Sequence, residues 1–230
     1  CMIRYSEASR RPDIELLSIT NHAKNILPME EILQFAKSSK DRSGVTVGEN
    51  GVGKSSLFDL SVGILKPEKG VIKINEIPIN GIDQKKKDLF TYLPHKDSLK
   101  EYLTVEENLF NWLELVDIKI RKEKLVNTLK FFKLNNLKNN LIGNLSQGQR
   151  KKVSLTKLLL SKCNLWILDE PFNGLDIDSI NKTKKMICNH KANGGSVLLA
   201  SHINLNIEGS RRIFIKSPKL KISNKIANFD

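Results

Sequence analysis

The sequence predicts an α/β fold in which helices cover both faces of a parallel or mixed sheet. Two runs, LWIL at 165–168 and SVLLA at 196–200, are too uniformly apolar for strands that face water on one side. Helical patterns separate such runs, and this alternation is typical of a sheet built through crossover connections. A glycine-rich loop at 48–53 also lies between an expected strand and an expected helix. With 230 residues, the chain is long enough for one compact domain.

The first part of the chain is expected to hold two strands and a helix. Strands are predicted at 14–19 and 43–47, and the second runs into the glycine-rich loop. A helix should begin near Lys54 and end near Lys66, because the following proline disfavours helix in the residue before it. This helix is expected to bury its apolar residues Leu57, Leu60 and Ile64.

The middle of the chain changes from strands to helices. Glycines bound the segment 70–81, which is predicted to be a hairpin, and another strand is expected at 90–94. A mainly helical stretch follows at about 96–160. Thr104 and Glu107 match a capping box, so a helix should start there. Further apolar residues repeat at helical spacing and are expected in the core: Leu125, Leu129 and Phe132.

Composition limits the function without choosing it. The formal charge of +13 permits attraction to nucleic acid, an anionic membrane surface or an acidic partner. Much of the excess is scattered lysine, which is most simply solvated surface. The longest apolar runs are far shorter than the roughly 20 residues needed to span a bilayer, so any membrane role would be peripheral. Three widely spaced cysteines argue against a disulfide framework and favour a reducing compartment.

The glycine-rich loop matches G-x-x-x-x-G-K-[ST], a loop that cradles nucleotide phosphates, at every fixed position. Gly48 and Gly53 allow the backbone to point N–H groups inward. Lys54 would reach the β and γ phosphates, and Ser55 would bind Mg²⁺. The residues expected to bind ATP are Gly48, Glu49, Asn50, Gly51, Val52, Gly53, Lys54, Ser55 and Ser56. The loop alone predicts nucleotide binding and nothing more.

Two carboxylates follow the apolar run at 165–168. Asp169 should emerge at the carboxyl edge of the sheet, where open α/β sheets place ligands and where it can hold Mg²⁺. Adjacent strand residues point in opposite directions, so Glu170 could instead polarise a water for attack on a γ-phosphate. An isolated Asp-Glu pair is usually surface decoration. The buried strand and the upstream loop favour the functional interpretation.

The segment LSQGQRKKV at 145–153 has a purely structural and a functional interpretation. Ser146 is a suitable N-cap, and the basic residues after it could simply begin a solvated helix. A serine and bare backbone amides at the positive end of a helix dipole are also suited to a γ-phosphate. The two interpretations are compatible.

The ordered motifs GENGVGKSS, LSQGQRKKV, LWILDEP, NGLD and SH resemble those of ATP-binding-cassette (ABC) ATPases across about residues 14–206. The resemblance implies a P-loop fold with a RecA-like core at about 14–95 and 156–206. It also implies a small antiparallel β region within that core and an inserted helical subdomain at about 96–155.

In that family two cassettes pack head to tail, and ATP lies between the P-loop of one and the LSxGQ loop of the other. The resemblance implies a homodimer in which ATP bound at Lys54 also contacts residues of the second copy, namely Ser146, Gln147, Gly148 and Gln149. It implies that Asp176 of NGLD communicates between the two sites and that His202 contacts the γ-phosphate. Glu170, His202 and Lys54 are the expected catalytic residues, with Mg²⁺ as cofactor.

One position departs from the family at large. After the strand YLP the usual residue is Gln, which contacts Mg²⁺ and the membrane partner, whereas this chain has His95. An imidazole can still coordinate a metal, and it can make the site sensitive to pH. The surrounding segment at 92–112 resembles the ATP-binding subunit of the cytochrome c maturation (haem exporter) transporter. That resemblance implies an integral membrane partner and a place on the cytoplasmic face of the inner membrane, or on the matrix face in an organelle.

Two other functions share these catalytic residues. Against an ABC ATPase for another exported substrate, such as a lipid, peptide or metal, only the segment from His95 to Trp112 argues. A non-transport ABC ATPase acting on ribosomes or DNA would suit the net charge of +13. Such proteins usually carry two cassettes or long insertions, so no nucleic-acid partner is expected.

Overall fold

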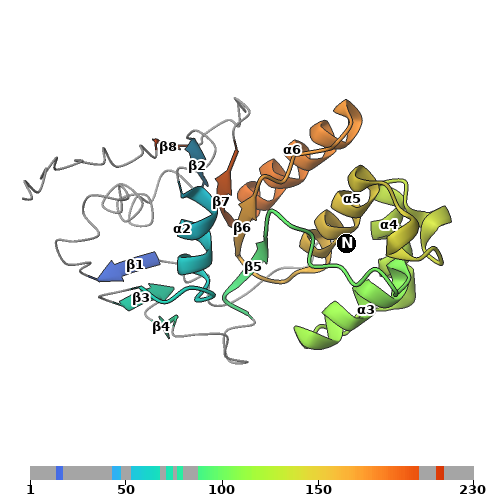
Figure 1. The fold of residues 1–230 in the computed structure, drawn as a ribbon, viewed down its shortest axis with the longest axis horizontal. Helices are drawn as coiled ribbons and strands as arrows, with labels where there is room; N and C mark the ends of the chain where they lie inside the picture. Colours follow the sequence, from blue (N-terminus) through green and yellow to red (C-terminus); the bar gives the residue numbers. More distant parts are fainter. Residues whose placement is uncertain are drawn as a thin grey trace, which may run out of the picture.

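The computed structural model describes most of the middle of the chain and several shorter segments around it. The described residues are 14–17, 43–47, 53–67, 71–74, 77–79, 88–201 and 211–214. They form two sheets and a set of helices (Figure 1). This arrangement confirms the predicted α/β fold.

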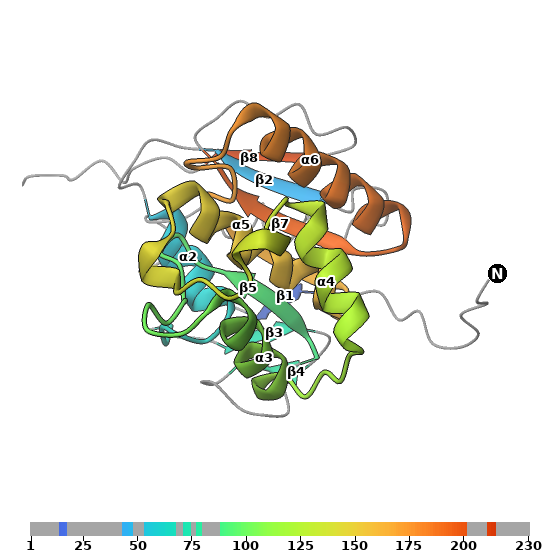
Figure 2. The same cartoon turned by 90° about the vertical axis from the view of Figure 1, so that its right-hand side faces the viewer.

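The larger sheet has the spatial order β5, β6, β7, β2, β8, and every neighbouring pair in it is parallel. Its strands are β5 (Phe90–Leu93), β6 (Leu165–Asp169), β7 (Ser196–Ala200), β2 (Ser43–Val47) and β8 (Arg211–Phe214). The first four lie where strands are predicted. The edge strand β8 is not predicted, because its sequence RRIF is short and half charged. Figure 2 shows β8 and β2 next to each other beside α6.

The smaller sheet is antiparallel and has the order β1, β3, β4. Its strands are β1 (Ile14–Leu17), β3 (Val71–Ile74) and β4 (Ile77–Pro78). Ile74 pairs with Ile77, which confirms the predicted hairpin. The tip of the hairpin at 75–76 and the end of the first predicted strand at 18–19 lie outside the described residues.

Five α-helices and two 3₁₀ turns make up the described helical structure. They are α2 (Lys54–Ser61), α3 (Val105–Leu115), α4 (Lys122–Phe131), η3 (Asn135–Leu137), η4 (Ile142–Asn144), α5 (Gln147–Leu160) and α6 (Ile177–Ala192). Helices α3 and α4 lie to one side of the larger sheet, with α5 between them and the strands (Figure 1). This arrangement suits an inserted helical unit, and the division at about 96–155 stays a prediction.

Helix α2 is shorter than predicted. It ends at Ser61, because Gly63 adopts a left-handed φ of 80° and closes a Schellman motif. In that motif the Ile64 amide donates to the Asp59 carbonyl at 2.8 Å and the Gly63 amide donates to the Leu60 carbonyl at 3.1 Å. Leu57 is fully buried as expected, whereas the expectation for Ile64 is wrong: it is 52% exposed beyond the helix end.

The helix starts and helical core in the middle of the chain are confirmed. Thr104 caps α3 in a capping box, with its hydroxyl accepting from the Glu107 amide and the Glu107 carboxylate accepting from the Thr104 amide. The apolar residues that repeat at helical spacing are all buried, namely Leu125, Leu129 and Phe132.

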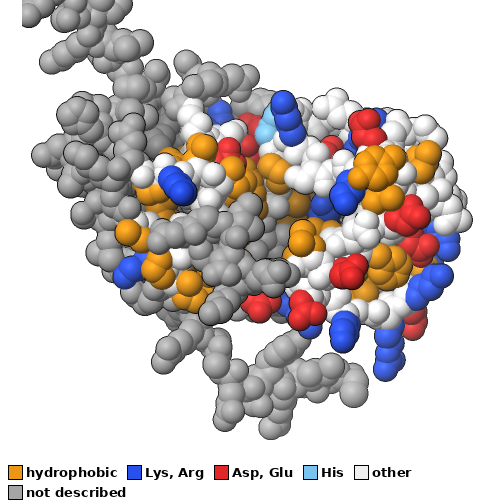
Figure 3. Space-filling view, turned by 60° about the horizontal axis from the view of Figure 1, so that its bottom comes forward, with side chains coloured by type: hydrophobic (Ala, Val, Ile, Leu, Met, Phe, Trp, Pro, Cys, Tyr) orange, Lys and Arg blue, Asp and Glu red, His pale blue; other side chains and the backbone are white. Residues whose placement is uncertain are grey.

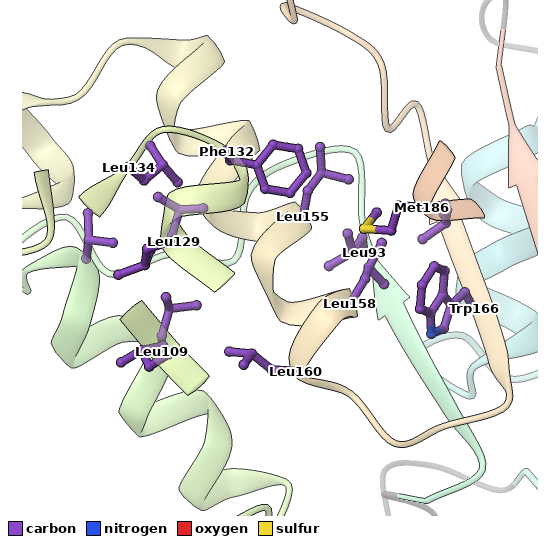
Figure 4. Close-up of a cluster of buried hydrophobic side chains, with 14 of the residues drawn as sticks. Leu93, Leu109, Leu129, Phe132, Leu134, Leu155, Leu158, Leu160, Trp166 and Met186 are labelled. Atoms are coloured by element: carbon purple, nitrogen blue, oxygen red, sulfur yellow. The ribbon is translucent and has the colours of Figure 1, made fainter. Parts of the chain in front are cut away.

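Strand β6 separates two hydrophobic clusters. Trp166 and Leu168 pack with apolar residues of α5 and α6 on one face of the sheet (Figure 4). Leu165 and Ile167 pack with α2 and β3 on the other face. Because successive strand residues point to opposite faces, β6 is buried along its whole length, as the apolar sequence predicts.

Candidate functional site

The strands bring most of the predicted site segments to one edge of the larger sheet. Ala200 of β7 pairs with both Asp169 of β6 and Thr46 of β2, and Leu93 of β5 pairs with Leu168. The chain therefore leaves four neighbouring parallel strands at their carboxyl ends within a short distance, since adjacent strands lie about 4.8 Å apart. We call this the carboxyl edge. It is the place where open parallel sheets bind ligands.

Some of the predicted residues lie outside the described part of the chain. Gly48, Glu49, Asn50, Gly51 and Val52 do so, and β2 ends immediately before them. His202 does so as well, one residue after the buried Ser201 that follows β7. The described strands fix the point on the carboxyl edge from which each of these segments departs.

The described end of the glycine-rich loop leads directly into α2. Gly53 has a φ of 98°, a conformation that glycine adopts without strain, and its carbonyl accepts the first helical hydrogen bond, from the Leu57 amide at 2.9 Å. No side chain of the described residues caps this helix. Lys54 is buried, whereas Ser55 and Ser56 are exposed. An uncapped helix start beside a buried lysine has the charge and the N–H groups that bind a phosphate.

Asp169 is the last residue of β6 and is only 1% exposed. Among the described residues, neither of its carboxylate oxygens has a hydrogen-bond partner. It continues the alternation of Leu165 and Ile167, so its side chain lies on the face of the sheet that α2 covers. A buried carboxylate without a partner is costly, and a bound cation removes that cost. Asp169 therefore fits the predicted Mg²⁺ site.

A hydrogen bond links β5 to α2 on the same face of the sheet as Asp169. The Tyr92 hydroxyl donates to Asp59 Oδ1 at 2.9 Å. Burial raises the pKa of Tyr92, and the neighbouring negative charges of Asp59 and Asp169 raise it further. Tyr92 is therefore a neutral donor that fixes α2 against the strand next to β6.

Glu170, the first residue after β6, has a left-handed backbone with a φ of 47°. Its amide donates to the Ala200 carbonyl at 3.0 Å, and its side chain is buried. Left-handed backbone at a non-glycine residue is uncommon and is found at sites whose surroundings impose it. This turn takes Glu170 out of the strand alternation, so that both adjacent carboxylates are held at the carboxyl edge.

His95 lies on the loop after β5 and is exposed. Two residues later, Asp97 accepts a hydrogen bond from the Ser154 hydroxyl of α5 at 3.1 Å. The loop that carries His95 is thereby fastened to the helix that begins with the LSQGQ segment.

Two buried lysines of α5 were not predicted to belong to this region. Lys151 is 4% exposed and Lys157 is 5% exposed. Burial lowers the pKa of Lys151, while nearby carboxylates act in the opposite direction, namely Asp97, Asp169 and Glu170. Burial likewise lowers the pKa of Lys157 to about 8, opposed by Asp97 alone. Their spacing with Ser154, at positions i, i+3 and i+6, places the three residues on one side of α5, but the sequence alone does not show that this side is buried.

The LSQGQ loop, residues 145–149, forms the start of α5 and lies apart from the strand ends. Ser146 is the N-cap, as predicted: its hydroxyl oxygen accepts from the Gln149 amide at 3.2 Å. The Gln149 side chain accepts in return from the Ser146 amide at 2.9 Å. Ser146 and Gln147 are exposed. Because a hydroxyl that accepts one bond can still donate another, Ser146 remains able to bind an anion.

Asp176 is the N-cap of α6 and ends the NGLD loop, residues 173–176. Its Oδ1 accepts from the Ser179 amide at 2.8 Å, and its Oδ2 accepts from Lys152 Nζ at 3.3 Å. The hydrogen bonds from Ser179, followed by the Lys152 ammonium, lower the pKa of Asp176 to about 2. The structure therefore places the LSQGQ and NGLD loops beside each other.

Comparisons with known proteins agree with this geometry. The family model described as ABC transporter matches residues 37–173, more than half of the chain. The cytochrome c biogenesis ATP-binding export protein CcmA of Histophilus somni is 36% identical over 155 residues, which cover 67% of this chain and 71% of that protein. ABC transporter I family member 1 of Arabidopsis thaliana is 34% identical over 203 residues, which cover 86% of this chain and 87% of that protein.

A solved structure has the same fold over much of its length. The putative ABC transporter ATP-binding protein from Pyrococcus furiosus superimposes with a TM-score of 0.65 and 29% identity, covering 76% of this chain and 85% of that one. The P-loop, the carboxylates after β6 and the family match agree on one conclusion. The chain belongs to the ABC transporter family, in which it is an ATP-hydrolysing subunit.

Proposed function

We propose that this ATPase powers an integral membrane partner in a haem exporter complex required for c-type cytochrome biogenesis. The observation that carries this proposal is the similarity to CcmA proteins, whose names give that export role, together with His95 and the segment that follows it. The chain would sit peripherally on the cytoplasmic face of the inner membrane, or on the matrix face in an organelle. None of the helices in the described ranges is long and apolar enough to cross a membrane.

Four residues are proposed to hold the nucleotide phosphates and Mg²⁺. Lys54 would bind the β and γ phosphates, and Ser55 and Asp169 would bind the metal, with His95 as a further ligand. Support comes from the carboxylate of Asp169, which has no hydrogen-bond partner among the described residues, and from its place on the face covered by α2, whose second residue is Ser55. The bound ion would neutralise negative charge on the phosphates.

Glu170 is proposed to be the general base. Its buried carboxylate would accept a proton from the water that attacks the γ-phosphate, and exclusion of bulk water favours that role. His202 would contact the same phosphate from the end of β7, which pairs with β6 at this edge. Lys54, Glu170 and His202 would thus act together.

A second copy of the chain is proposed to complete each site. The start of α5 is exposed, and it presents backbone amides and the Ser146 hydroxyl. Ser146, Gln147, Gly148 and Gln149 would bind the ATP held by the partner's P-loop, and Asp176 would connect the two sites. The positive end of the α5 dipole favours the negative γ-phosphate.

The segments that contain Tyr102 and Leu141 present exposed apolar side chains that suit a protein partner. Tyr102 is 73% exposed and Leu141 is 42% exposed, and a β-bridge between Thr104 and Leu141 brings their segments together. On the face seen in Figure 3, basic and acidic side chains are interspersed with apolar ones. A mixed surface of this kind favours docking of a protein over binding of nucleic acid.

Co-purification tests the partner. The tagged chain should recover a multi-span membrane protein from detergent extracts, and Tyr102→Glu should weaken that recovery. Leu115→Glu, at the opposite end of α3 and also exposed, is the matched control and should not. Sedimentation with ribosomes that RNase abolishes would instead support the non-transport alternative.

A further inference from the structure

The LSQGQ and NGLD loops are in backbone contact within one chain. A Cβ built on Gly148 would stand 2.6 Å from the carbonyl oxygen of Gly174. Such an approach is shorter than real Cβ contacts, and the obstacle is backbone, which cannot rotate away as a flexible side chain would. Gly174 has a φ of 74°, so a side chain there would be strained as well. Gly148 is therefore required for packing within the chain, independently of any phosphate.

An ion pair joins the NGLD loop to α5, on the face of the helix that carries Gly148. Lys152 Nζ lies 3.3 Å from Asp176 Oδ2, and Lys152 follows Gly148 by four residues, which places both on one helix face. The side chain of Lys152 is 17% exposed. Because the other oxygen of Asp176 accepts from the Ser179 amide, the carboxylate is held between α5 and the start of α6.

The NGLD loop is in turn linked to Glu170 by a compact turn. The Asn173 amide donates to the Glu170 carbonyl at 3.3 Å, and the Leu175 amide donates to the Phe172 carbonyl at 3.3 Å. No more than six residues separate Glu170 from Asp176. This short segment can absorb little movement. A displacement of Asp176 is therefore transmitted to the strained backbone of Glu170.

We propose that Lys152 is a positioning residue that ties the LSQGQ loop to the NGLD loop and thereby sets the backbone of Glu170 in the same chain. When the LSQGQ loop closes on ATP held by a second copy, Lys152 and the Gly148 contact carry that movement to this chain's own base. In each protomer, contact with the ATP held by the partner's P-loop thus affects the position of that protomer's own general base. The inference rests on the proposed dimer and on the proposed role of Glu170.

Amide hydrogen exchange of the nucleotide-free chain tests the tie itself. Lys152→Met should speed exchange in the segment 170–176, and Lys152→Arg should restore protection. Lys182→Met is the matched control, since Lys182 pairs with Asp178 within α6 at 3.0 Å and has similar side-chain exposure. Unchanged exchange in Lys152→Met would overturn the inference, whether or not the proposed function holds.

Steady-state ATP hydrolysis tests the consequence. Lys152→Met should lower kcat by roughly 2- to 30-fold, the range expected of residues that carry coupling, and should leave the KM for ATP unchanged because the P-loop is intact. Lys152→Arg should recover most of the loss, and Lys182→Met should match the unsubstituted chain. If Lys152→Met lowered only the melting temperature and left kcat normal, Lys152 would have a purely structural role and the inference would be wrong. Absence of turnover in every chain would count against the proposed function, and the exchange experiment would then decide the inference alone.

Discussion

Glu170 combines burial with a backbone conformation that costs about 1–3 kcal/mol at a residue with a side chain. The hydrogen bond from its amide to Ala200 and the turn that follows hold it there. Asp169, one residue earlier, retains strand geometry and faces α2. Neighbouring carboxylates are thus separated by backbone geometry into two environments, which suits two different roles.

Replacement of Glu170 by Gln tests its role as a base. Glu170→Gln keeps the shape and hydrogen-bonding ability of the side chain but cannot accept the proton from water. ATP binding should persist, while turnover falls by about 10² to 10⁴. Nucleotide titration and phosphate release measure the two quantities. Glu114→Gln, on the exposed surface of α3, removes the same charge and should leave turnover unchanged. Hydrolysis near the normal rate in Glu170→Gln would exclude the role.

For single residues, the sequence predicts a role only where the neighbouring residues in the chain determine the environment. The apolar run before Asp169 places that residue at a strand end without any knowledge of tertiary structure. Lys151 could not be recognised in the same way, because its burial depends on where α5 packs relative to the Asp97 loop. Nothing in the sequence RKK distinguishes Lys151 from the exposed lysines that are more common.

Helix α5 is the element that joins the predicted site segments. It begins at the LSQGQ loop, pairs with Asp176 through Lys152, and donates a hydrogen bond to Asp97 through Ser154. Lys157, further along the same helix, is buried near Asp97. A helix that carries charged groups on an inward face must keep their partners in place, so its polar contacts constrain the loops around it.

The buried Lys157 predicts a measurable pH dependence of stability. Burial lowers its pKa from the ordinary 10.5 to about 8. Below pH 8 the lysine is charged in both the folded and the unfolded chain, and the full penalty of burying the charge applies. Between pH 8 and 10.5 the folded chain releases the proton while the unfolded chain keeps it, so stability rises by up to about 3 kcal/mol.

Chemical denaturation across this pH range checks the effect. The Lys157→Met variant should lack this rise, so its free energy of unfolding relative to the unsubstituted chain should decrease as the pH increases. Lys130→Met, which removes an exposed lysine of α4, should run parallel to the unsubstituted chain. A constant difference between Lys157→Met and the unsubstituted chain would contradict the assignment.

Elements were predictable where local chemistry decides them. The capping box at Thr104 and the N-cap at Ser146 each depend on residues within four positions of the sequence, and both are confirmed. Helix α2 ends before the predicted position, because Gly63 stops it ahead of the proline that follows Lys66. Residues 211–214 form strand β8 only because they pair with β2, which lies far away in the sequence.

At the scale of the whole molecule, net charge opposes the proposed dimer. Two chains that each carry +13 must approach, and bound ATP offsets only part of that charge. With saturating Mg-ATP, Glu170→Gln should therefore form dimers more completely as ionic strength rises, since screening weakens the repulsion. Gel filtration with light scattering measures this. Dimers that dissociate on adding salt would show instead that intermolecular ion pairs hold them together.

The order of the strands could not be predicted, although every described strand except β8 was. Neither the adjacency of β5 and β6 nor the central position of β7 follows from any local pattern. Strand order depends on how the two hydrophobic clusters divide the faces of β6, and that division emerges only when α2, α5 and α6 pack together. The functional motifs were recognisable earlier because their residue types are dictated by the ligand.

The indole of Trp166 stacks on the imidazole of His190 with ring centroids 3.6 Å apart and planes 6° from parallel. Gly195 leaves the space for that imidazole, since a Cβ there would run into the ring. The other tryptophan of the sequence, Trp112, belongs to α3. The chain thus carries two tryptophan fluorophores, one in the parallel sheet beside an imidazole quencher and one among the helices, and each can be observed alone after conservative replacement of the other.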